Sequence, residues 1–437
     1  MKKIFFIGCI SLFLLSGCKG NSPVEHGAYT KLSLDLTNST ALFISDDVSL
    51  IKKVVSKKSL EEDSVSKIYK LNENGAVEEV EIKFIYTDSQ GNEHIDTNVS
   101  SYKVNQLIHI SDKYMIIRFF TEESEEYFLT NLDTGDSYLF NDIKPMPEFI
   151  GISDDSKGFY GSVYPQDKYG NIYMRSMDSE LCRLVLTNPE QPIFEQVSIP
   201  TEKVQYFGVD LEGNIAYAGK NSSFNNILRY VTKDGAVKNL PGVADNKSVF
   251  WQGYDGGLFY YNDYIPSEYE SHVVSIQPSP FTITPYADAD SHIAFSNLIS
   301  MLQCNSIENK YLFSNNKIFK VDDLEDPMIR AYSSSETLGF TTLLSGHSSD
   351  NYLYFVGRDS YNNSSLVRVN PDTFAKEVLI DESYELYDWK VSSDDSITFN
   401  ALQMSTGKIV VGYVSPSGEI TVSDANLSKK VSVLIKL

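Results

Sequence analysis

The segment YFLTNLDTGDSYLF (residues 127–140) contains the pattern that decides the fold: an apolar strand, a polar turn that carries Gly, and a second strand. Apolar and aromatic residues dominate both halves, and these residue types suit a pleated, half-buried surface. Asn131 and Gly135 flank the turn, and Asn and Gly accept the tight backbone bends that a hairpin requires. The segment therefore predicts an antiparallel β-hairpin.

The same unit recurs along the chain. Its other copies are IYKLNENGAVEEV from Ile68, LCRLVLTNPEQPIFEQV from Leu181, ILRYVTKDGAVKNL from Ile227, HVVSIQPSPFTI from His272, KIFKVDDLEDPMI from Lys317, LVRVNPDTFAKEVL from Leu366 and VVGYVSPSGEITV from Val410. The eight turns centre near Gly75, Gly135, Glu190, Gly235, Pro278, Glu325, Thr373 and Gly418, about 43 to 60 residues apart. Most spacings lie near 45 residues, which is the length of a four-stranded propeller blade.

A further strand precedes most of these units. Examples are GNIYM from Gly170, GNIAYAG from Gly213, GGLFYYN from Gly256, KYLFSN from Lys310 and NYLYFVG from Asn351. Because no sustained helical period follows residue 30, we expect an all-β fold with almost no helix: a single β-propeller domain over residues 31–437. About eight four-stranded blades are predicted. Seven is the alternative, because the first unit is irregular.

The ring of blades must close, since a free sheet edge invites aggregation. Either Lys31–Leu36 or Val431–Leu437 could add a strand to the blade of the opposite terminus. Two packed β-sandwiches are the structural alternative to a propeller. They would not produce eight similar turns at one spacing.

The N-terminus has the layout of a secretory signal. Lys2 and Lys3 precede an apolar run to Leu15, which is too short to span a bilayer, and Ser16-Gly17-Cys18 follows. This stretch resembles a bacterial lipoprotein signal. The resemblance implies that residues 1–17 are removed, that the Cys18 thiol receives a diacylglyceryl group, and that the new amine is often acylated. An ordinary secretory signal that happens to contain a Cys is the alternative.

Residues 18–30 are then the lipidated Cys and a polar tether containing Gly and Pro. In Gram-negative lipoproteins an Asp after the lipidated Cys commonly signals retention in the inner membrane. Lys19 occupies that place here, so the resemblance favours the outer membrane of a bacterial cell envelope.

Charge and cysteine content narrow the range of partners. The net charge of −22 repels nucleic acid, and the one basic cluster, Lys52 to Lys58, is followed at once by acidic residues, so it is interpreted as a solvated face. Cys182 and Cys304 remain in the mature chain. They form either a disulfide or, as we favour, two separate buried thiols, because two distant strands must bring their Cα atoms within about 7 Å to be bridged.

Two segments could bind ligands. The aromatic stretch Phe250–Tyr264 could stack on sugar or peptide, although packing between blades explains it better. Asp288, Asp290 and His292 alternate, so on a strand they would face one side as metal ligands. A polar connection between blades is the simpler interpretation, and we predict no metal site and no cofactor.

No catalytic residue is predicted, because the chain contains no G-x-S-x-G, H-E-x-x-H or P-loop motif. The turn Asn131-Leu132-Asp133-Thr134-Gly135 resembles the outer turn of quinoprotein-type propellers, as in the propeller lipoprotein of the outer-membrane β-barrel assembly machinery. The repeat's usual Trp is absent here, and the resemblance does not imply a quinone cofactor.

The sequence therefore predicts a lipid-anchored envelope protein that is a non-catalytic protein-interaction scaffold. Its partners would be the membrane, through the anchor, and an envelope protein. A glycan- or peptide-binding surface lipoprotein is one alternative. A propeller hydrolase with carboxylates in its central channel is the other.

The anchor is testable by replacing Cys18 with Ala. We expect the variant to leave the membrane fraction, because it lacks the thiol that carries the lipid. Fractionation with a high-salt wash measures this, and retention of the variant in the washed membranes would contradict a lipoprotein.

Overall fold

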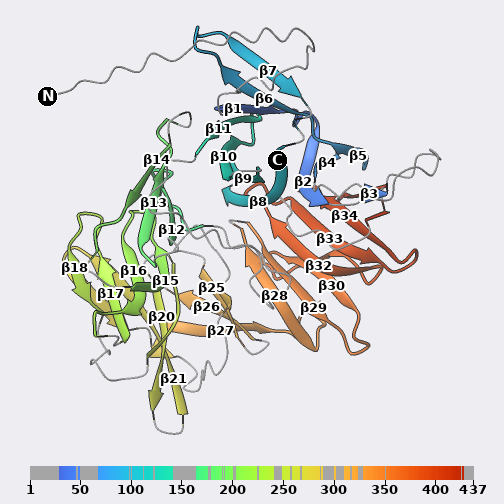
Figure 1. Ribbon diagram of the computed structural model, residues 1–437. Coiled ribbons are helices and arrows are strands. Elements are labelled where there is room, and N and C mark those ends of the chain that lie inside the picture. The colour runs from blue at the N-terminus through green and yellow to red at the C-terminus, as the bar shows by residue number, and fades with distance from the viewer. Residues whose placement is uncertain are drawn as a thin grey trace, which may run out of the picture.

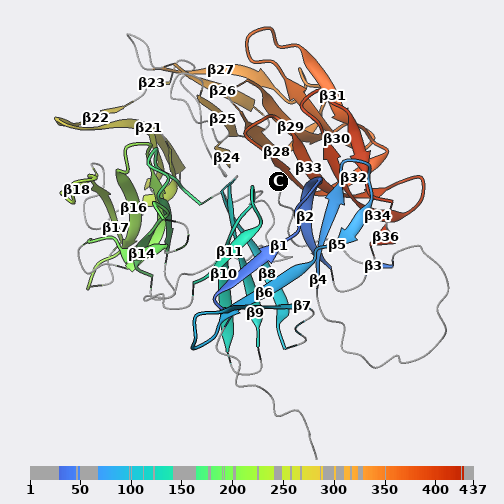
Figure 2. The same ribbon diagram turned by 90° about the horizontal axis from the view of Figure 1, so that it is seen from above.

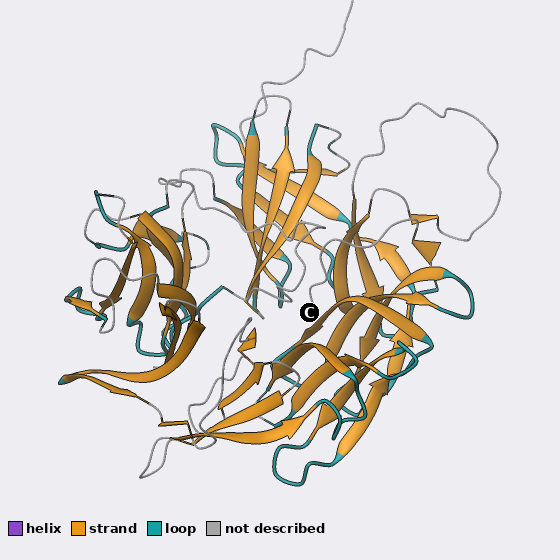
Figure 3. Cartoon of the chain, turned by 90° about the horizontal axis from the view of Figure 1, so that it is seen from below, coloured by secondary structure: helices purple, strands orange, loops and turns teal. Residues whose placement is uncertain are grey.

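The computed structural model describes residues 29–427, except 46–47, 50–66, 98, 100, 112, 122–123, 141–163, 176–178, 189, 191, 200–202, 224–225, 241–248, 256–257, 266–267, 286, 289–299, 302–309, 315–316, 323–327, 350 and 425. All regular structure in these residues is β-strand, as predicted, and Figure 3 contains no helix. It follows that the described residues include no helix of the length and hydropathy needed to cross a membrane.

The described strands form eight sheets, which we number in chain order. Sheet 1 contains β2 (Ser39–Ser45), β4 (Lys67–Asn72) and β5 (Val77–Glu79); sheet 2, β8 (Lys103–Ser111), β9 (Tyr114–Phe120), β10 (Glu125–Asn131) and β11 (Asp136–Leu139), with β1 (Lys31–Leu34), β6 (Ile82–Thr87) and β7 (Glu93–Thr97) added; sheet 3, β12 (Ile172–Arg175), β13 (Leu181–Val185) and β14 (Ile193–Gln196); and sheet 4, β15 (Lys203–Val209), β16 (Ile215–Lys220), β17 (Asn226–Val231) and β18 (Val237–Asn239).

The other four sheets follow the same plan. Sheet 5 contains β19 (Val249–Asp255), β20 (Leu258–Ile265), β21 (Glu268–Pro278) and β22 (Phe281–Pro285); sheet 6, β24 (Ser300–Met301), β25 (Lys310–Ser314), β26 (Lys317–Asp322) and β27 (Met328–Ser334), with β23 (Ala287–Asp288) added; sheet 7, β28 (Thr342–Ser348), β29 (Leu353–Arg358), β30 (Ser364–Val369) and β31 (Lys376–Ile380); and sheet 8, β32 (Tyr384–Val391), β33 (Ile397–Gln403), β34 (Lys408–Val414) and β35 (Ile420–Val422), with β36 (Asn426–Leu427) and β3 (Val48–Ser49) added.

Every turn predicted from the repeat lies between two antiparallel strands, and these hairpins belong to eight different sheets. Turns of one geometry recur within the sheets. In the turn Asp210–Asn214, the Asp210 amide donates to the Asn214 carbonyl at 2.9 Å, and the Gly213 amide donates to the Asp210 carbonyl at 3.0 Å. Gly213 has a φ of +84°, a left-handed conformation that Gly adopts without the steric cost of a Cβ atom.

The sheets form a β-propeller arrangement, in which sheets 1–4, 7 and 8 each share clusters of buried side chains with two neighbouring sheets. Shared clusters of buried side chains join sheets 1 and 2, 2 and 3, 3 and 4, 4 and 5, 6 and 7, and 7 and 8. Between sheets 5 and 6, β23 follows β22 in the chain and pairs in parallel with β27. Figures 1 and 2 show the sheets side by side around a common centre.

The last sheet meets the first. Val411 and Leu427 of sheet 8 share a cluster with Phe43 and Leu71 of sheet 1, and β3 pairs with β36. Of the two segments that could add a strand to the blade of the opposite terminus, the N-terminal one does not do so. Strand β1, within Lys31–Leu36, pairs with β11 and β6 of sheet 2 instead, because its Leu residues are buried in the cluster between sheets 1 and 2. Val431–Leu437 lies outside the described residues.

The predicted tether is also too long by at least two residues. Tyr29 is buried, and its hydroxyl donates to Asp96 at 2.8 Å. The Thr30 amide donates to the Ile85 carbonyl at 3.1 Å. The folded body therefore includes residues 29 and 30, which anchor the start of β1.

Closure of the ring is testable at Gly75, whose φ of +83° matches the +84° of Gly235. A Cβ atom at Gly75 would lie 2.6 Å from the Val422 carbonyl oxygen of sheet 8, whereas one at Gly235 would meet nothing within 4 Å. Gly→Ala strains the backbone equally at both positions. We expect Gly75→Ala to lower the free energy of unfolding by about 1–3 kcal/mol more than Gly235→Ala, measured in urea. Equal losses would contradict contact between the first and last sheets.

Candidate functional site

The ligand-binding segments considered from sequence do not form a described site. Asp288 lies in β23, while Asp290 and His292 lie outside the described residues, as does Cys18. Within the described part of the chain, no three His, Cys, Asp or Glu side chains are placed to hold a metal ion. The aromatic stretch Phe250–Tyr264 falls on β19 and β20, where the backbone pairs Trp251 with Tyr261.

Cys182 is a free thiol buried in the cluster between sheets 2 and 3. Burial, with a smaller contribution from Glu180, raises the pKa of this thiol to about 12. Because the thiolate is the reactive form, Cys182 fills space in the core and is not a nucleophile. Cys304 lies outside the described residues.

Sheet 2 carries a feature that the repeat did not predict, a hairpin formed by β6 and β7, which we call the arm (residues 82–97). The strand order β7-β6-β1-β11-β10-β9-β8 places the arm beyond the last strand of the four-stranded unit. Figure 1 shows the arm at the top of the molecule, beyond β1 and β11. Strand β7 forms the outer edge of the described sheet, and its Ile95 side chain is 60% exposed.

The arm has a rigid tip and a rigid base. At the tip, the Asp88 carboxylate accepts hydrogen bonds from the amides of Gln90 and Asn92 and lies 2.9 Å from His94 Nε2. These contacts lower the pKa of Asp88, and the contact with His94 contributes most. At the base, Tyr29 packs against Phe84 with ring centroids 5.2 Å apart. The arm is therefore held in a defined position and does not need to be ordered by a partner.

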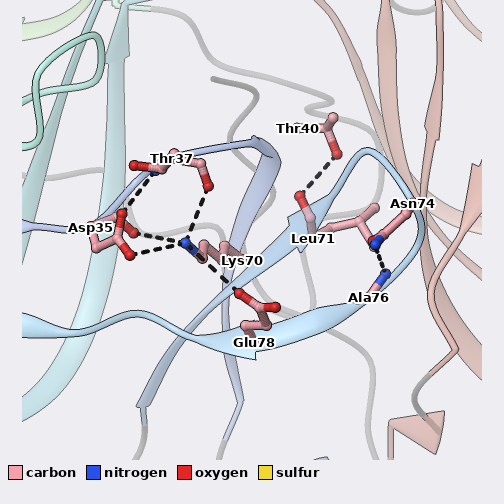
Figure 4. A network of polar contacts seen from close by, with 8 residues as sticks. All are labelled: Asp35, Thr37, Thr40, Lys70, Leu71, Asn74, Ala76 and Glu78. Atoms are coloured by element: carbon pink, nitrogen blue, oxygen red, sulfur yellow. Dashed lines mark hydrogen bonds and ion pairs between the residues drawn. The ribbon is translucent and has the colours of Figure 1, made fainter.

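A buried lysine of sheet 1 holds the segment between β1 and β2 (Figure 4). Lys70 of β4 has a side chain that is only 6% exposed, and its Nζ donates to the carbonyls of Asp35 and Thr37 at 3.3 and 3.2 Å. Its Nζ also lies 3.4 Å from the Asp35 carboxylate and 3.9 Å from that of Glu78. The segment between β1 and β2 is thus fixed where the chain passes from sheet 2 to sheet 1.

The second candidate group, which we call the inner group, is His109 of β8 with Asp388 and Lys390 of β32. Sheet 1 lies between sheets 2 and 8, so charges on β8 and β32 can influence one another only on the inner side of the ring. Burial and the positive charge of Lys390 lower the pKa of His109 to about 3. Burial also lowers the pKa of Lys390 and raises that of Asp388. The two strands therefore face a common, poorly solvated space.

This inner group does not provide the chemistry of a glycosidase. Retaining and inverting glycosidases use two carboxyl groups on either side of the scissile bond. The described inner group has one, Asp388, accompanied by a lysine and a histidine. The predicted alternative of a hydrolase with channel carboxylates therefore gains no support from the described residues.

No family model matches this chain, and no curated protein matches it. Solved structures with a similar fold include TolB from Acinetobacter baumannii, at 13% identity and a TM-score of 0.32, covering 76% of this chain and 81% of TolB. Oligogalacturonate lyase from Vibrio parahaemolyticus has 10% identity and a TM-score of 0.42, with coverages of 79% and 97%.

A puromycin-hydrolyzing peptidase from Mycobacterium tuberculosis has 12% identity and a TM-score of 0.45. The match covers 75% of this chain and 53% of the peptidase, so the chain spans about half of the peptidase's length.

The inner group predicts a pH dependence of stability. Unfolded His binds a proton near pH 6.5, whereas folded His109 does so near pH 3, so the folded protein loses stability as the pH falls between these values. Between pH 7 and pH 5, the wild type should lose up to about 2 kcal/mol more than His109→Gln in urea unfolding. A wild-type profile for His109→Gln would contradict the lowered pKa of His109.

Proposed function

We propose that this protein is a lipid-anchored β-propeller of eight blades that acts as a non-catalytic protein-interaction scaffold in the bacterial cell envelope. The arm carries this proposal. It extends a sheet beyond the four-stranded unit, its tip and base are held by hydrogen bonds and ring contacts, and it presents an exposed aliphatic side chain at its edge.

The number of eight blades follows from the eight repeat units. Each unit supplies one hairpin to a separate sheet, and shared clusters of buried side chains join consecutive sheets from sheet 1 to sheet 5 and from sheet 6 to sheet 8. The cluster between sheets 8 and 1 then closes the set. A ring of seven blades would leave one of these eight sheets outside the ring.

The proposed anchor places the arm near the membrane. Residue 18 would carry the lipid, and Tyr29 at the base of the arm is the first described residue that is fixed in the fold. The intervening segment reaches at most about 40 Å when fully extended. A partner that binds the arm would therefore be a membrane protein or a protein bound close to the membrane. Lys19 favours the outer membrane as the site.

The partner would use side-chain contacts with the arm, with Ile95 at their centre. When a partner buries an exposed aliphatic side chain, the free energy of binding improves by roughly 25 cal/mol for each Å² of apolar surface removed from water. The outer edge of β7 could add hydrogen bonds to an extended segment of the partner. Its short length and its charged neighbours Glu93 and Asp96 protect it from indiscriminate pairing.

We expect Ile95→Glu to abolish partner capture. The test is mild crosslinking in native membranes with a C-terminally tagged chain, followed by quantification of what co-purifies. Val378→Glu is the matched control, because Val378 is 52% exposed on β31, the edge strand of sheet 7. The wild type and Val378→Glu should retain one stoichiometric protein partner that Ile95→Glu loses. The absence of any such partner from wild-type membranes, or equal capture by both variants, would contradict the proposal.

A further inference from the structure

A polar cavity of about 470 Å³ lies between the turns of sheets 7 and 8. Its volume falls within the range of about 300–1,000 Å³ that small-molecule sites occupy. It is lined by Asn351, Tyr352, Asn370, Pro371, Asp372, Asp395 and Pro416. None of these residues belongs to the arm or to the inner group.

Asp395 is the unusual residue of this cavity. It occupies the fourth position of the turn Ser392–Ser396, which has the same hydrogen bonds as the turn Asp210–Asn214. The φ of Asp395 is +67°, a left-handed conformation in which Asp costs more free energy than Gly. Gly stands at the same position in six other turns, at 75, 91, 170, 213, 235 and 418.

The Asp395 carboxylate crosses from sheet 8 to sheet 7, although the residue is only 8% exposed. Its Oδ1 accepts a hydrogen bond from the Tyr354 hydroxyl at 2.9 Å, and its Oδ2 accepts one from the Asn351 amide at 2.8 Å. Burial and the neighbouring Asp395 raise the pKa of Tyr354, so its hydroxyl remains a donor. Each carboxylate oxygen can accept a further hydrogen bond from a group in the cavity.

The nearest cation is engaged elsewhere. Arg368 donates two hydrogen bonds to Glu377, at 3.2 and 2.7 Å, and one to the Pro416 carbonyl at 2.7 Å. Its guanidinium lies over the Tyr352 ring, 4.7 Å from the centroid. Arg368 therefore positions the walls of the cavity, and the described partners of Asp395 are neutral donors.

The remaining lining residues supply both donors and acceptors. The Asn370 side-chain oxygen accepts hydrogen bonds from the amides of Asp372 and Thr373, which leaves its NH₂ group as a donor. The exposed Asp372 carboxylate and the Asn351 side-chain oxygen are acceptors. Hydroxyl groups on adjacent carbons match such a surface, because each hydroxyl both donates and accepts. The rings of Pro371, Pro416 and Tyr352 offer apolar surface for the C–H faces of a sugar.

We propose that this cavity binds a neutral carbohydrate through hydroxyl groups that donate to Asp395 and Asp372. The mixed lining distinguishes this ligand from a metal ion. A divalent cation would require several oxygen ligands around it. The side-chain amide of Asn351 instead directs its N–H, and not its oxygen, toward Asp395 Oδ2. The site is separate from the arm, so it can fail or succeed independently of the scaffold proposal.

The experiment is saturation-transfer NMR, followed by calorimetry, on the full-length protein in detergent. The probes are glucose, galactose, N-acetylglucosamine and the disaccharides maltose, lactose and chitobiose. Asp395→Asn keeps a side chain that tolerates the left-handed backbone but removes the charge, and Asp395→Gly removes the side chain and relieves the strain. We expect each to weaken sugar binding about tenfold or more.

Asn362→Gly is the matched control. Asn362 has the same φ of +67° at the same position of the exposed turn Asp359–Asn363 in sheet 7, outside the cavity, so this variant should keep wild-type affinity. Circular dichroism and urea midpoints verify that the variants are folded. The proposal would be overturned if no sugar bound, or if Asp395→Gly bound sugar as tightly as the wild type. It would also be overturned if Ca²⁺ or lysinamide bound at Asp395 in place of sugar.

Discussion

The structure depends on one constraint: a sheet that is apolar on both faces must be covered by two neighbours. Strand β34 illustrates it, because Val411 packs toward sheet 1 and Val414 packs toward sheet 7. A sheet of three or four short strands with two apolar faces would expose large apolar surface if it stood alone. A linear stack would leave its first and last sheets uncovered on one face. Contact between sheets 8 and 1 removes that cost.

The repeat was predictable from sequence because it is a local signal. Turns such as those at Gly75 and Gly418 are specified by residues that lie within five positions of one another, so their chemistry is visible without knowledge of the fold. The spacing of the turns then indicated a propeller. The position of β1 was not predictable in the same way. Leu32 and Leu34 indicate an apolar strand, but the sequence does not indicate which of several sheet edges this strand pairs with.

The candidate sites could not be predicted from the sequence, because they too depend on contacts between distant segments. Lys70 and Asp35, His109 and Lys390, and Tyr354 and Asp395 each come from segments that are distant in the sequence and that only the fold brings together. The arm had a weak signal, since residues 82–97 contain two short strands around Asp88–Asn92. Within the irregular first unit that signal did not stand out. An Asp at a turn position that Gly usually occupies, as at Asp395, is a signal that a comparison of the aligned turns would have revealed.

The central claim is that the first and last sheets are in contact, because this contact closes the ring. The most direct measurement is the distance between two spin labels, one at Glu73 in the turn of sheet 1 and one at Glu419 in the turn of sheet 8. The Thr421 hydroxyl beside this turn lies 3.5 Å from the Glu73 carbonyl, so the account predicts a single, short and narrow distance. A long or broad distribution would show that the ring is open, and the account of the fold would be wrong.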